Sequence, residues 1–275
     1  MLMLLLFHFV YKKVINVPLA STPQYLGVMS DLAEQFDLII PSSEPELARL
    51  AQIQDVKSRF PLLMVDPEIL NTFMDKYKAF IFFEKNKIKS PETKLFADVE
   101  VSDLPVYIKP RRGAGSYGHR LITTALELQA VKQIAPDNWI GQEYLTGDDN
   151  EYTCALFRSN DNVRHIALKR RLQGDKSVKA EVVDNPEINS LLEMVANLLN
   201  FRGCINVQLK MTDNGPIIFE INPRLSSTVM MRHRIGFKDC SWWVKDFFGM
   251  LVDDYCVPES GTMVYRMSTE CVVPR

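Results

Sequence analysis

The chain has 275 residues, of which 47% are hydrophobic and 24% are charged, and its net charge is −2 with a pI near 6.1. This length and composition are typical of one large globular domain or two closely packed ones. The near-neutral charge argues against a protein that binds nucleic acid through a basic surface, so we expect no nucleic acid among the partners. Five cysteines without paired spacing indicate a reducing compartment, and we expect a cytoplasmic protein.

The N-terminus begins with the apolar run MLMLLLFHFV. A bilayer requires roughly 20 apolar residues, so we predict no membrane span. The run also lacks the basic segment and the cleavage site of a secretory signal. We predict a buried first strand, with an anchor at a membrane surface as the alternative.

The next part of the chain alternates between helical and extended patterns. Apolar residues recur at helical spacing from Leu26 to Ala33, and residues 36–40 (FDLII) predict a short buried strand that ends at Pro41. Ser43 and Glu46 have the spacing of a capping box. This alternation predicts a parallel α/β unit. A helix capped by Thr72 is expected over residues 72–87.

Residues 104–222 have the pattern of a mixed α and β structure rich in strands. A strand (LPVYIKP), a glycine-rich loop (RRGAGSYGHR), a helix and a second strand (NWIGQEYL) come first. Two hairpins are predicted next, one around the turn NDN at 160–162 and one around DNG at 213–215, with a helix at 187–200 between them. Residues 226–252 are expected to be mostly helical, and a strand is expected at the end of the chain.

Lys109 lies at the end of a strand, directly before the glycine-rich loop 113–118. An ammonium beside loop N–H groups can bind a phosphate. The spacing fits neither a Walker loop nor the dinucleotide motif. A solvated basic hairpin is the alternative for this segment, and an exposed helix position is the alternative for Lys76.

The strand end with Gln142 and Glu143 is followed closely by Glu151. Backbone groups at a strand end can bind the edge of a base, and a carboxylate can accept from ribose hydroxyls. An acidic hinge loop is the alternative.

The hairpin at 204–223 carries the strongest pattern, with Gln208 on one strand and Glu220 and Asn222 on the other. The i, i+2 spacing places Glu220 and Asn222 on one face of their strand. Such hard oxygen ligands suit magnesium together with phosphate oxygens and water. Arg224 follows two residues later, within reach of a phosphoryl group.

These segments resemble the ATP-grasp superfamily, and most closely its carbamoyl phosphate synthetase large-subunit and biotin carboxylase branch. The resemblance rests on DK at 75–76, IKPRRGAGSYG at 108–118, QEYL…NEYT at 142–153 and FEINPRLSS at 219–227. It implies an α/β (α+β) protein in which residues 1–71 form a shortened pre-ATP-grasp domain. Residues 72–275 would form the ATP-grasp domain, with a lid at about 105–145.

The resemblance also implies residue roles. Nucleotide phosphates would contact Lys76 and Lys109, and the adenosine would contact Glu143, Tyr144, Leu145 and Glu151. The flexible lid would comprise Gly113, Ala114, Gly115 and Ser116. Magnesium (or manganese) would be held by Gln208, Glu220 and Asn222, while Arg224 and Lys109 would be the catalytic residues.

The resemblance implies an ATP-dependent ligase that joins a carboxylate to an amine or another nucleophile through an acyl phosphate. The small-molecule acid and amine are left open, as is a homodimer. Arg232, His233 and Arg234 could hold the acid, or form a basic helix face. Gln208 stands where an acid is common, and the N-terminal domain is short. A carbamoyl-phosphate-forming enzyme and a non-catalytic nucleotide-binding protein therefore remain alternatives.

Overall fold

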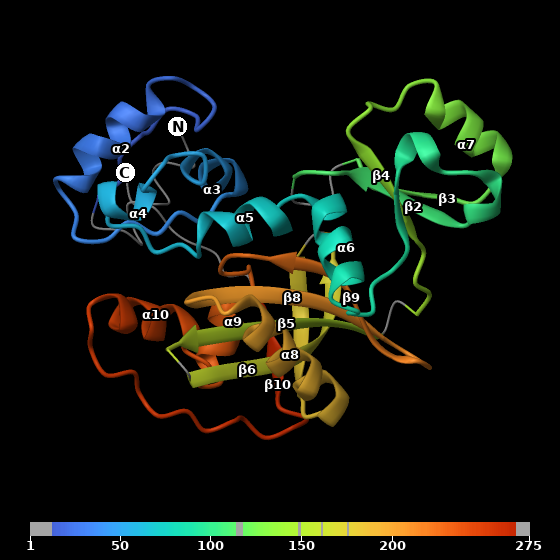
Figure 1. Cartoon of the computed structure of the whole chain (residues 1–275). Coiled ribbons are helices and arrows are strands. Elements are labelled where there is room, and N and C mark those ends of the chain that lie inside the picture. The colour runs from blue at the N-terminus through green and yellow to red at the C-terminus, as the bar shows by residue number, and fades with distance from the viewer. Residues whose placement is uncertain (1–12, 114–117, 148–149, 161, 175, 268–275) are drawn as a thin grey trace, which may run out of the picture.

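The computed structural model describes residues 13–113, 118–147, 150–160, 162–174 and 176–267. An N-terminal group of helices, a small sheet and a large sheet form three parts of the structure (Figure 1). The first strand expected at the N-terminus falls almost wholly on residues 1–12, outside the described residues. It therefore stays a prediction.

The large sheet is antiparallel, with six strands in the order β10-β7-β6-β5-β8-β9. Its strands are β5 (Glu151–Ser159), β6 (Asn162–Gln173), β7 (Lys176–Val183), β8 (Gly203–Thr212), β9 (Gly215–Asn222) and β10 (Met263–Tyr265). Both predicted hairpins are confirmed, because β5 pairs with β6 and β8 pairs with β9. The terminal strand is confirmed only over β10, since residues 268–275 are outside the described residues.

The small sheet is also antiparallel, with the order β1-β4-β2-β3. Its strands are β1 (Thr93–Leu95), β2 (Val106–Pro110), β3 (Arg120–Ile122) and β4 (Trp139–Glu143). The helix α7 (Ala125–Lys132) and two short 3₁₀ turns, η1 (Phe96–Asp98) and η2 (Val101–Asp103), complete this part. This part has its own hydrophobic core, which includes Ile108, Ile122 and Leu128 and is separate from the core of the rest of the chain.

The N-terminal part contains the helices α2 (Tyr25–Ala33), α3 (Glu44–Leu50), α4 (Val56–Arg59) and α5 (Pro67–Phe73). Ser43 caps α3, as predicted, and its hydroxyl donates to Glu46 at 2.6 Å. The strand predicted at 36–40 is wrong. Only a single parallel bridge forms, between Ile39 and Leu62, and Phe36 is exposed. Too little apolar surface is buried there for a full strand.

The single helix predicted over 72–87 is also wrong, since the chain forms α5 and a separate helix α6 (Lys76–Lys85). Asp75, not Thr72, caps α6, because its carboxylate accepts from the N–H of Lys78 at 3.1 Å. The Thr72 hydroxyl instead donates to the carbonyl of Glu68 inside α5. The break aims Lys76 toward the large sheet.

Three helices follow the hairpins: α8 (Pro186–Leu199), α9 (Val229–Arg234) and α10 (Asp239–Phe247). Trp242 of α10 packs on Phe157 of β5, with ring centroids 5.6 Å apart. The described cysteines are free thiols. No helix in the described ranges is both long and apolar enough to cross a membrane.

Gly203 lies at the contact between β8 and α10 and has a φ of +114°. A Cβ atom there would come within 2.2 Å of the Trp243 ring. We expect Gly203→Ala to lower the free energy of unfolding in urea by roughly 2–4 kcal/mol, because it adds overpacking to a left-handed backbone.

Gly236→Ala is the matched control, since Gly236 has a φ of +98° with nothing within 4 Å of the added Cβ. It should cost only about 1–2 kcal/mol, the backbone part of the effect. Equal losses in the two variants would contradict the packing at Trp243.

Candidate functional site

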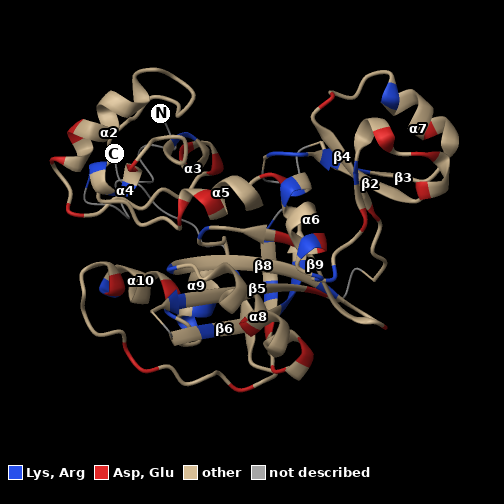
Figure 2. Cartoon of the chain, viewed as in Figure 1, with Lys and Arg blue, Asp and Glu red and all other residues tan. Residues whose placement is uncertain are grey.

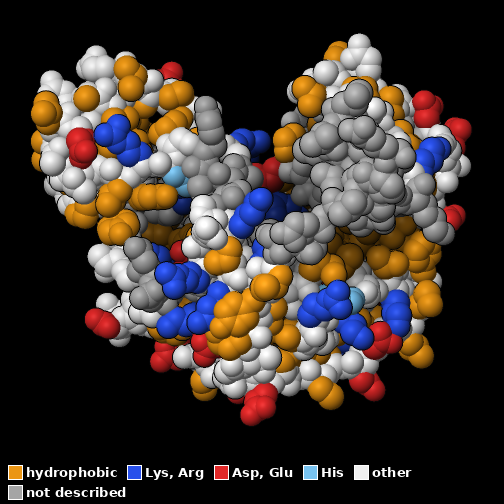
Figure 3. Space-filling view, turned by 180° about the vertical axis from the view of Figure 1, so that it is seen from behind, with side chains coloured by type: hydrophobic (Ala, Val, Ile, Leu, Met, Phe, Trp, Pro, Cys, Tyr) orange, Lys and Arg blue, Asp and Glu red, His pale blue; other side chains and the backbone are white. Residues whose placement is uncertain are grey.

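Three adjoining cavities lie where the three parts of the chain meet. The first, of about 240 Å³, lies between the small sheet and the β8–β9 hairpin, and the second, of about 320 Å³, shares His119, Arg170 and Glu220 with it. The third, of about 880 Å³, shares Gly113 and Arg224 with the second and reaches the N-terminal helices. Lys and Arg side chains gather in the hollow between the two upper parts (Figure 3), and Figure 2 shows basic positions on α6 and the neighbouring strands.

Lys76 joins the three parts of the chain. Its side chain is 8% exposed, and its Nζ lies 3.8 Å from Glu220 Oε1 on β9. The same Nζ donates to the carbonyl of Gly113 at 2.8 Å, and the Lys76 N–H donates to the carbonyl of Arg111 at 2.9 Å. The exposed helix position considered for Lys76 is therefore excluded by its burial.

Lys109 is 4% exposed at the end of β2 and donates to Gln142 Oε1 at 2.8 Å. Burial lowers the pKa of the Lys109 ammonium to about 8; Glu220 raises it in part, and Lys76 lowers it further. A buried ammonium with one neutral acceptor is poorly compensated. Binding an anion there costs little further desolvation free energy, because folding has already removed the hydration water of the ammonium.

Glu220 faces both lysines. Burial alone would raise the pKa of its carboxyl group, but the charges of Lys76 and Lys109 and a hydrogen bond from Asn222 hold it below its usual value. The carboxylate of Glu220 and the amide oxygen of Asn222 are hard ligands that fit a magnesium ion. In the part of the chain that the structure describes, no three His, Cys, Asp or Glu side chains form a metal cluster. A cation here therefore needs further oxygen ligands from a bound molecule or from water.

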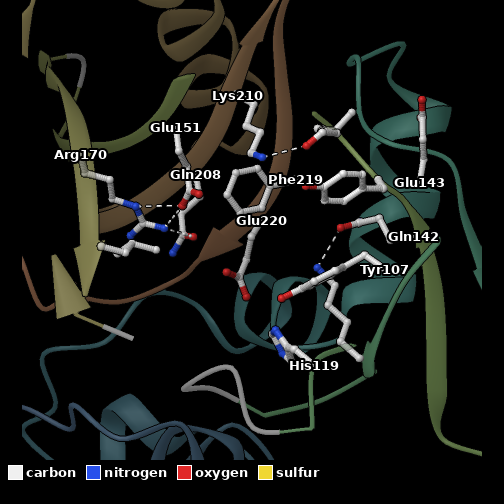
Figure 4. Close-up of a pocket in the computed structure, with 14 residues that line it drawn as sticks. Tyr107, His119, Gln142, Glu143, Glu151, Arg170, Gln208, Lys210, Phe219 and Glu220 are labelled. Carbon is white, nitrogen blue, oxygen red and sulfur yellow. Dashed lines mark hydrogen bonds and ion pairs between the residues drawn. The ribbon is translucent and has the colours of Figure 1, made fainter. Parts of the chain in front are cut away.

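Gln208 lies opposite Glu220 in the strand pairing but is held by an arginine that the motifs did not indicate. Arg170 of β6 donates from Nη2 to Gln208 Oε1 at 2.9 Å and from Nε to Glu151 Oε1 at 3.0 Å (Figure 4). Because a guanidinium only donates, it fixes which side of the Gln208 amide carries the oxygen. Arg170 thus bridges Glu151 and Gln208. Because the Gln208 oxygen already accepts a hydrogen bond from this arginine, it is less available to coordinate a metal ion.

The segment after β4 lines the first cavity with Tyr144 and Leu145. Lys210 of β8 donates to the carbonyl of Leu145 at 2.8 Å, and its Nζ lies 5.9 Å from the Tyr144 ring centroid. The side chain of Glu143 extends away from the other labelled residues and accepts from the N–H of Glu92 at 3.2 Å (Figure 4). Strand alternation explains this, since it is Gln142 that points inward.

His119 lies between the first two cavities and packs edge-on against Tyr107, with ring centroids 5.6 Å apart. Burial, followed by the charges of Lys109 and Lys76, lowers the pKa of His119 to about 4. The imidazole is therefore neutral near pH 7. Of the expected lid, only Gly113 is described; Ala114, Gly115 and Ser116 lie outside the described residues.

Arg224 follows β9 and reaches the N-terminal part of the chain. Its Nη2 donates to Glu44 Oε1 at 3.0 Å, while its Nε is buried and has no hydrogen-bond partner among the described residues. Arg232 is 1% exposed and paired with Asp239, so it is neither the free substrate-binding arginine nor the basic helix face that the sequence allowed. It bonds to Ser226 and Thr228 beside the second cavity instead.

The structure thus gathers Lys76, Lys109, Glu220 and Asn222 at one point, with Glu151 and Gln208 beside them. It turns the side chain of Glu143 away and ties Arg224 to Glu44. Sequence reasoning missed Arg170, Lys210 and the inward role of Gln142. Of these three, only Gln142 had a signal in the sequence: side chains alternate along a strand, so Gln142 and Glu143 must point to opposite faces.

Comparison with known proteins identifies one matching family. Residues 135–271 match the family described as ATP-grasp in the biosynthetic pathway with Ter operon. No curated protein sequence matches the chain significantly.

Solved structures resemble the chain over most of its length. An N5-carboxyaminoimidazole ribonucleotide synthetase in complex with ADP has a TM-score of 0.72 and 14% identity, covering 86% of this chain and 67% of that one. The Staphylococcus aureus N5-carboxyaminoimidazole synthetase with ADP has a TM-score of 0.71 and 16% identity, covering 90% and 69%.

A third structure is the biotin carboxylase domain dimer of Hydrogenobacter thermophilus 2-oxoglutarate carboxylase, bound to MgADP, ADP and bicarbonate. It has a TM-score of 0.71 and 16% identity, covering 91% of this chain and 62% of that one. The chain thus spans 62–69% of the length of these three structures. At these identities the likeness is one of fold.

The depressed pKa of Lys109 predicts a pH dependence for anion binding. In the free protein Lys109 is charged below pH about 8 and neutral above it. We expect the affinity for a non-hydrolysable ATP analogue with Mg²⁺ to be steady below that pH. Above it, the affinity should fall by up to about tenfold per pH unit. Isothermal titration calorimetry between pH about 6.5 and about 9.5 measures this, with proton uptake on binding near pH 8.

Lys109→Met should weaken binding and abolish this dependence, whereas Lys78→Met, an exposed position on the same helix as Lys76, should leave both unchanged. A wild-type affinity that stays constant through pH 8 would contradict the placement of Lys109 at the anion.

Proposed function

Because the chain is an ATP-grasp protein, we propose that it is an ATP-dependent ligase that joins a carboxylate to an amine or another nucleophile through an acyl phosphate. The observation that supports this most directly is the convergence of Lys76, Lys109 and Glu220 at one buried point. Two buried ammonium groups beside a single carboxylate carry an excess of positive charge, which a triphosphate would neutralise.

In this proposal the nucleotide occupies the first cavity. The base lies along Tyr144 and Leu145, the ribose hydroxyls donate to Glu151, and the phosphates extend toward Lys76 and Lys109. Glu220 and Asn222 would hold a magnesium ion, for which manganese could substitute, and the ion would neutralise charge on the phosphate oxygens. The neighbour bound to MgADP supports this assignment by analogy of fold.

The chemistry requires two displacements. An oxygen of the substrate carboxylate attacks the γ-phosphorus and ADP leaves; the amine then attacks the acyl carbon, phosphate leaves, and the amine loses a proton. Lys109 and Arg224 stabilise the negative charge that develops on the transferred phosphoryl group. No nucleophile from the protein is needed.

The third cavity supports a place for the acid. It lies beyond Arg224, between Gly113 and the start of α3, and adjoins the second cavity. The distribution of the three cavities therefore lets one molecule present a carboxylate at the end of a triphosphate. Orientation of this kind contributes much of the rate of such reactions. A homodimer stays a prediction.

A screen of carboxylic acids and amines for phosphate release from Mg-ATP tests the proposal. Release should require both an acid and an amine. Glu220→Gln and Lys109→Ala should each lower it by about 10²–10³-fold, because each removes a preorganised charge. Glu193→Gln, an exposed residue with a side chain that is 64% accessible, is the control and should have normal activity.

Different results favour the other two functions. Turnover with bicarbonate and ammonia that yields a product still carrying a phosphate would favour a carbamoyl-phosphate-forming enzyme. ATP binding by calorimetry without turnover of any acid and amine would favour a non-catalytic nucleotide-binding protein. Hydrolysis that survives Glu220→Gln and Lys109→Ala would contradict the assigned site.

A further inference from the structure

Two buried hydrogen-bond donors that line the second cavity have no acceptor in the described part of the chain. Asn206 of β8 is 1% exposed, and its Oδ1 accepts from the Thr153 hydroxyl at 2.9 Å. Its Nδ2 is buried and has no partner among the described residues, and the same is true of Arg224 Nε. Both residues line this cavity of about 320 Å³. A buried donor without an acceptor costs free energy, so two at one cavity indicate a ligand that accepts.

A hydroxyl proton adds to this set. Arg232 Nη1 donates to Ser226 Oγ at 2.7 Å and to Thr228 Oγ1 at 3.0 Å, and the two hydroxyl oxygens lie 2.7 Å apart. One hydroxyl proton serves the bond between them. Both oxygens already accept from the arginine, and the other proton has no acceptor among the residues that the structure describes.

The charges around this cavity favour an anion. Arg170 and Arg224 line it and are paired with Glu151 and Glu44, and its own carboxylate, Glu220, faces both Lys76 and Lys109. Four cations thus face three carboxylates, which leaves an excess of one positive charge. His119 is neutral near pH 7 because burial lowers its pKa to about 4. The free donors and the net positive charge together fit an oxyanion better than a cation or an amine.

The body of such a ligand has room in one direction. The second cavity opens into the third, of about 880 Å³, past Gly113, Arg224, Ser226 and Ser227. The exposed surface of the third cavity is mainly apolar, although serines, Glu44 and Arg112 also line it. Its apolar side chains are Pro45, Ala48, Met74, Leu225 and Val229. A small acid without an apolar body would leave this space filled only with water.

We propose that Asn206 and Arg224 bind the carboxylate of the acid substrate, and that this substrate has an extended, mainly apolar body that lies in the third cavity. This inference rests on the proposed function, of which it names the substrate class. Asn206 donates from Nδ2 to one carboxylate oxygen, and Arg224 donates from Nε to the carboxylate. The amide of Asn206 thereby becomes a substrate-binding group in addition to the residues that the motifs indicated.

The test measures binding of two acids, acetate and hexanoate, to the full chain that is saturated with Mg²⁺ and a non-hydrolysable ATP analogue. We expect hexanoate to bind at least about tenfold more tightly, because its chain buries apolar surface. Asn206→Asp replaces the donor with an acceptor of equal size and should weaken the binding of hexanoate by about 10–100-fold. The affinity for the nucleotide analogue should stay the same. Asn162→Asp, at an exposed position, is the control.

Each outcome has a distinct meaning. If the analogue itself does not bind, the proposed function fails. If the analogue binds but hexanoate gains nothing over acetate, or Asn206→Asp binds hexanoate normally, the proposed function stands and this inference is overturned.

An effect of Asn206→Asp on folding would show in its melting temperature, and the side-chain ¹⁵N resonance of Asn206 in the wild type then decides. It should shift on addition of hexanoate, and an unchanged resonance would contradict the contact.

Discussion

The removal of two ammonium groups from water, beside one carboxylate, is the constraint on which the site depends. Lys76 and Lys109 are 8% and 4% exposed, and each has lost most of the hydration that an ammonium normally keeps. Part of that loss is compensated by Glu220, by the carbonyl of Gly113 and by the amide of Gln142. The remaining electrostatic cost is a property of the fold itself, since one lysine begins a helix and the other ends a strand. A bound polyanion would recover it, and binding sites commonly store free energy in this way.

The antiparallel sheet explains why the polar groups lie on one side of it. On β8, Asn206 and Gln208 share a face, and on β9, Glu220 and Asn222 share a face, because side chains alternate along a strand. The pairing places Gln208 opposite Glu220 and Asn206 opposite Asn222. A shift of β9 by one residue in this register would turn Glu220 and Asn222 to the opposite, apolar face of the sheet. The register of a single hairpin therefore positions both the proposed metal ligands and the amide of Asn206.

The sequence predicted those features that depend on neighbouring residues. The turns at 160–162 and 213–215, the cap at Ser43 and the i, i+2 spacing of Glu220 and Asn222 are local, and the structure has them. The ATP-grasp expectation, drawn from four short motifs in order, is confirmed by the comparisons.

Features that depend on contacts between distant segments could not be predicted in the same way. Arg170 meets Glu151 and Gln208 only because β6, β5 and β8 are adjacent in the sheet. The helix break before Lys76 is fixed by Asp75, which is 2% exposed and bonds to Arg111 at 2.6 Å from another part of the chain. Periodicity alone favours one continuous helix there, since every residue from 72 to 87 is compatible with it.

The contacts of Lys76 connect the proposed phosphate site to Gly113, where the predicted lid begins. Asp75 accepts from Arg111 at 2.6 Å and lies 3.4 Å from Arg112, and Lys76 Nζ donates to the carbonyl of Gly113. An ammonium has three N–H groups, and Gly113 and Glu220 engage two directions. A phosphate oxygen that takes the third would therefore add to these contacts without replacing them. The same ammonium would then contact the start of the glycine-rich loop, the carboxylate on β9 and the phosphate. A movement of the loop at Gly113 would therefore move the ammonium and change its contact with the phosphate.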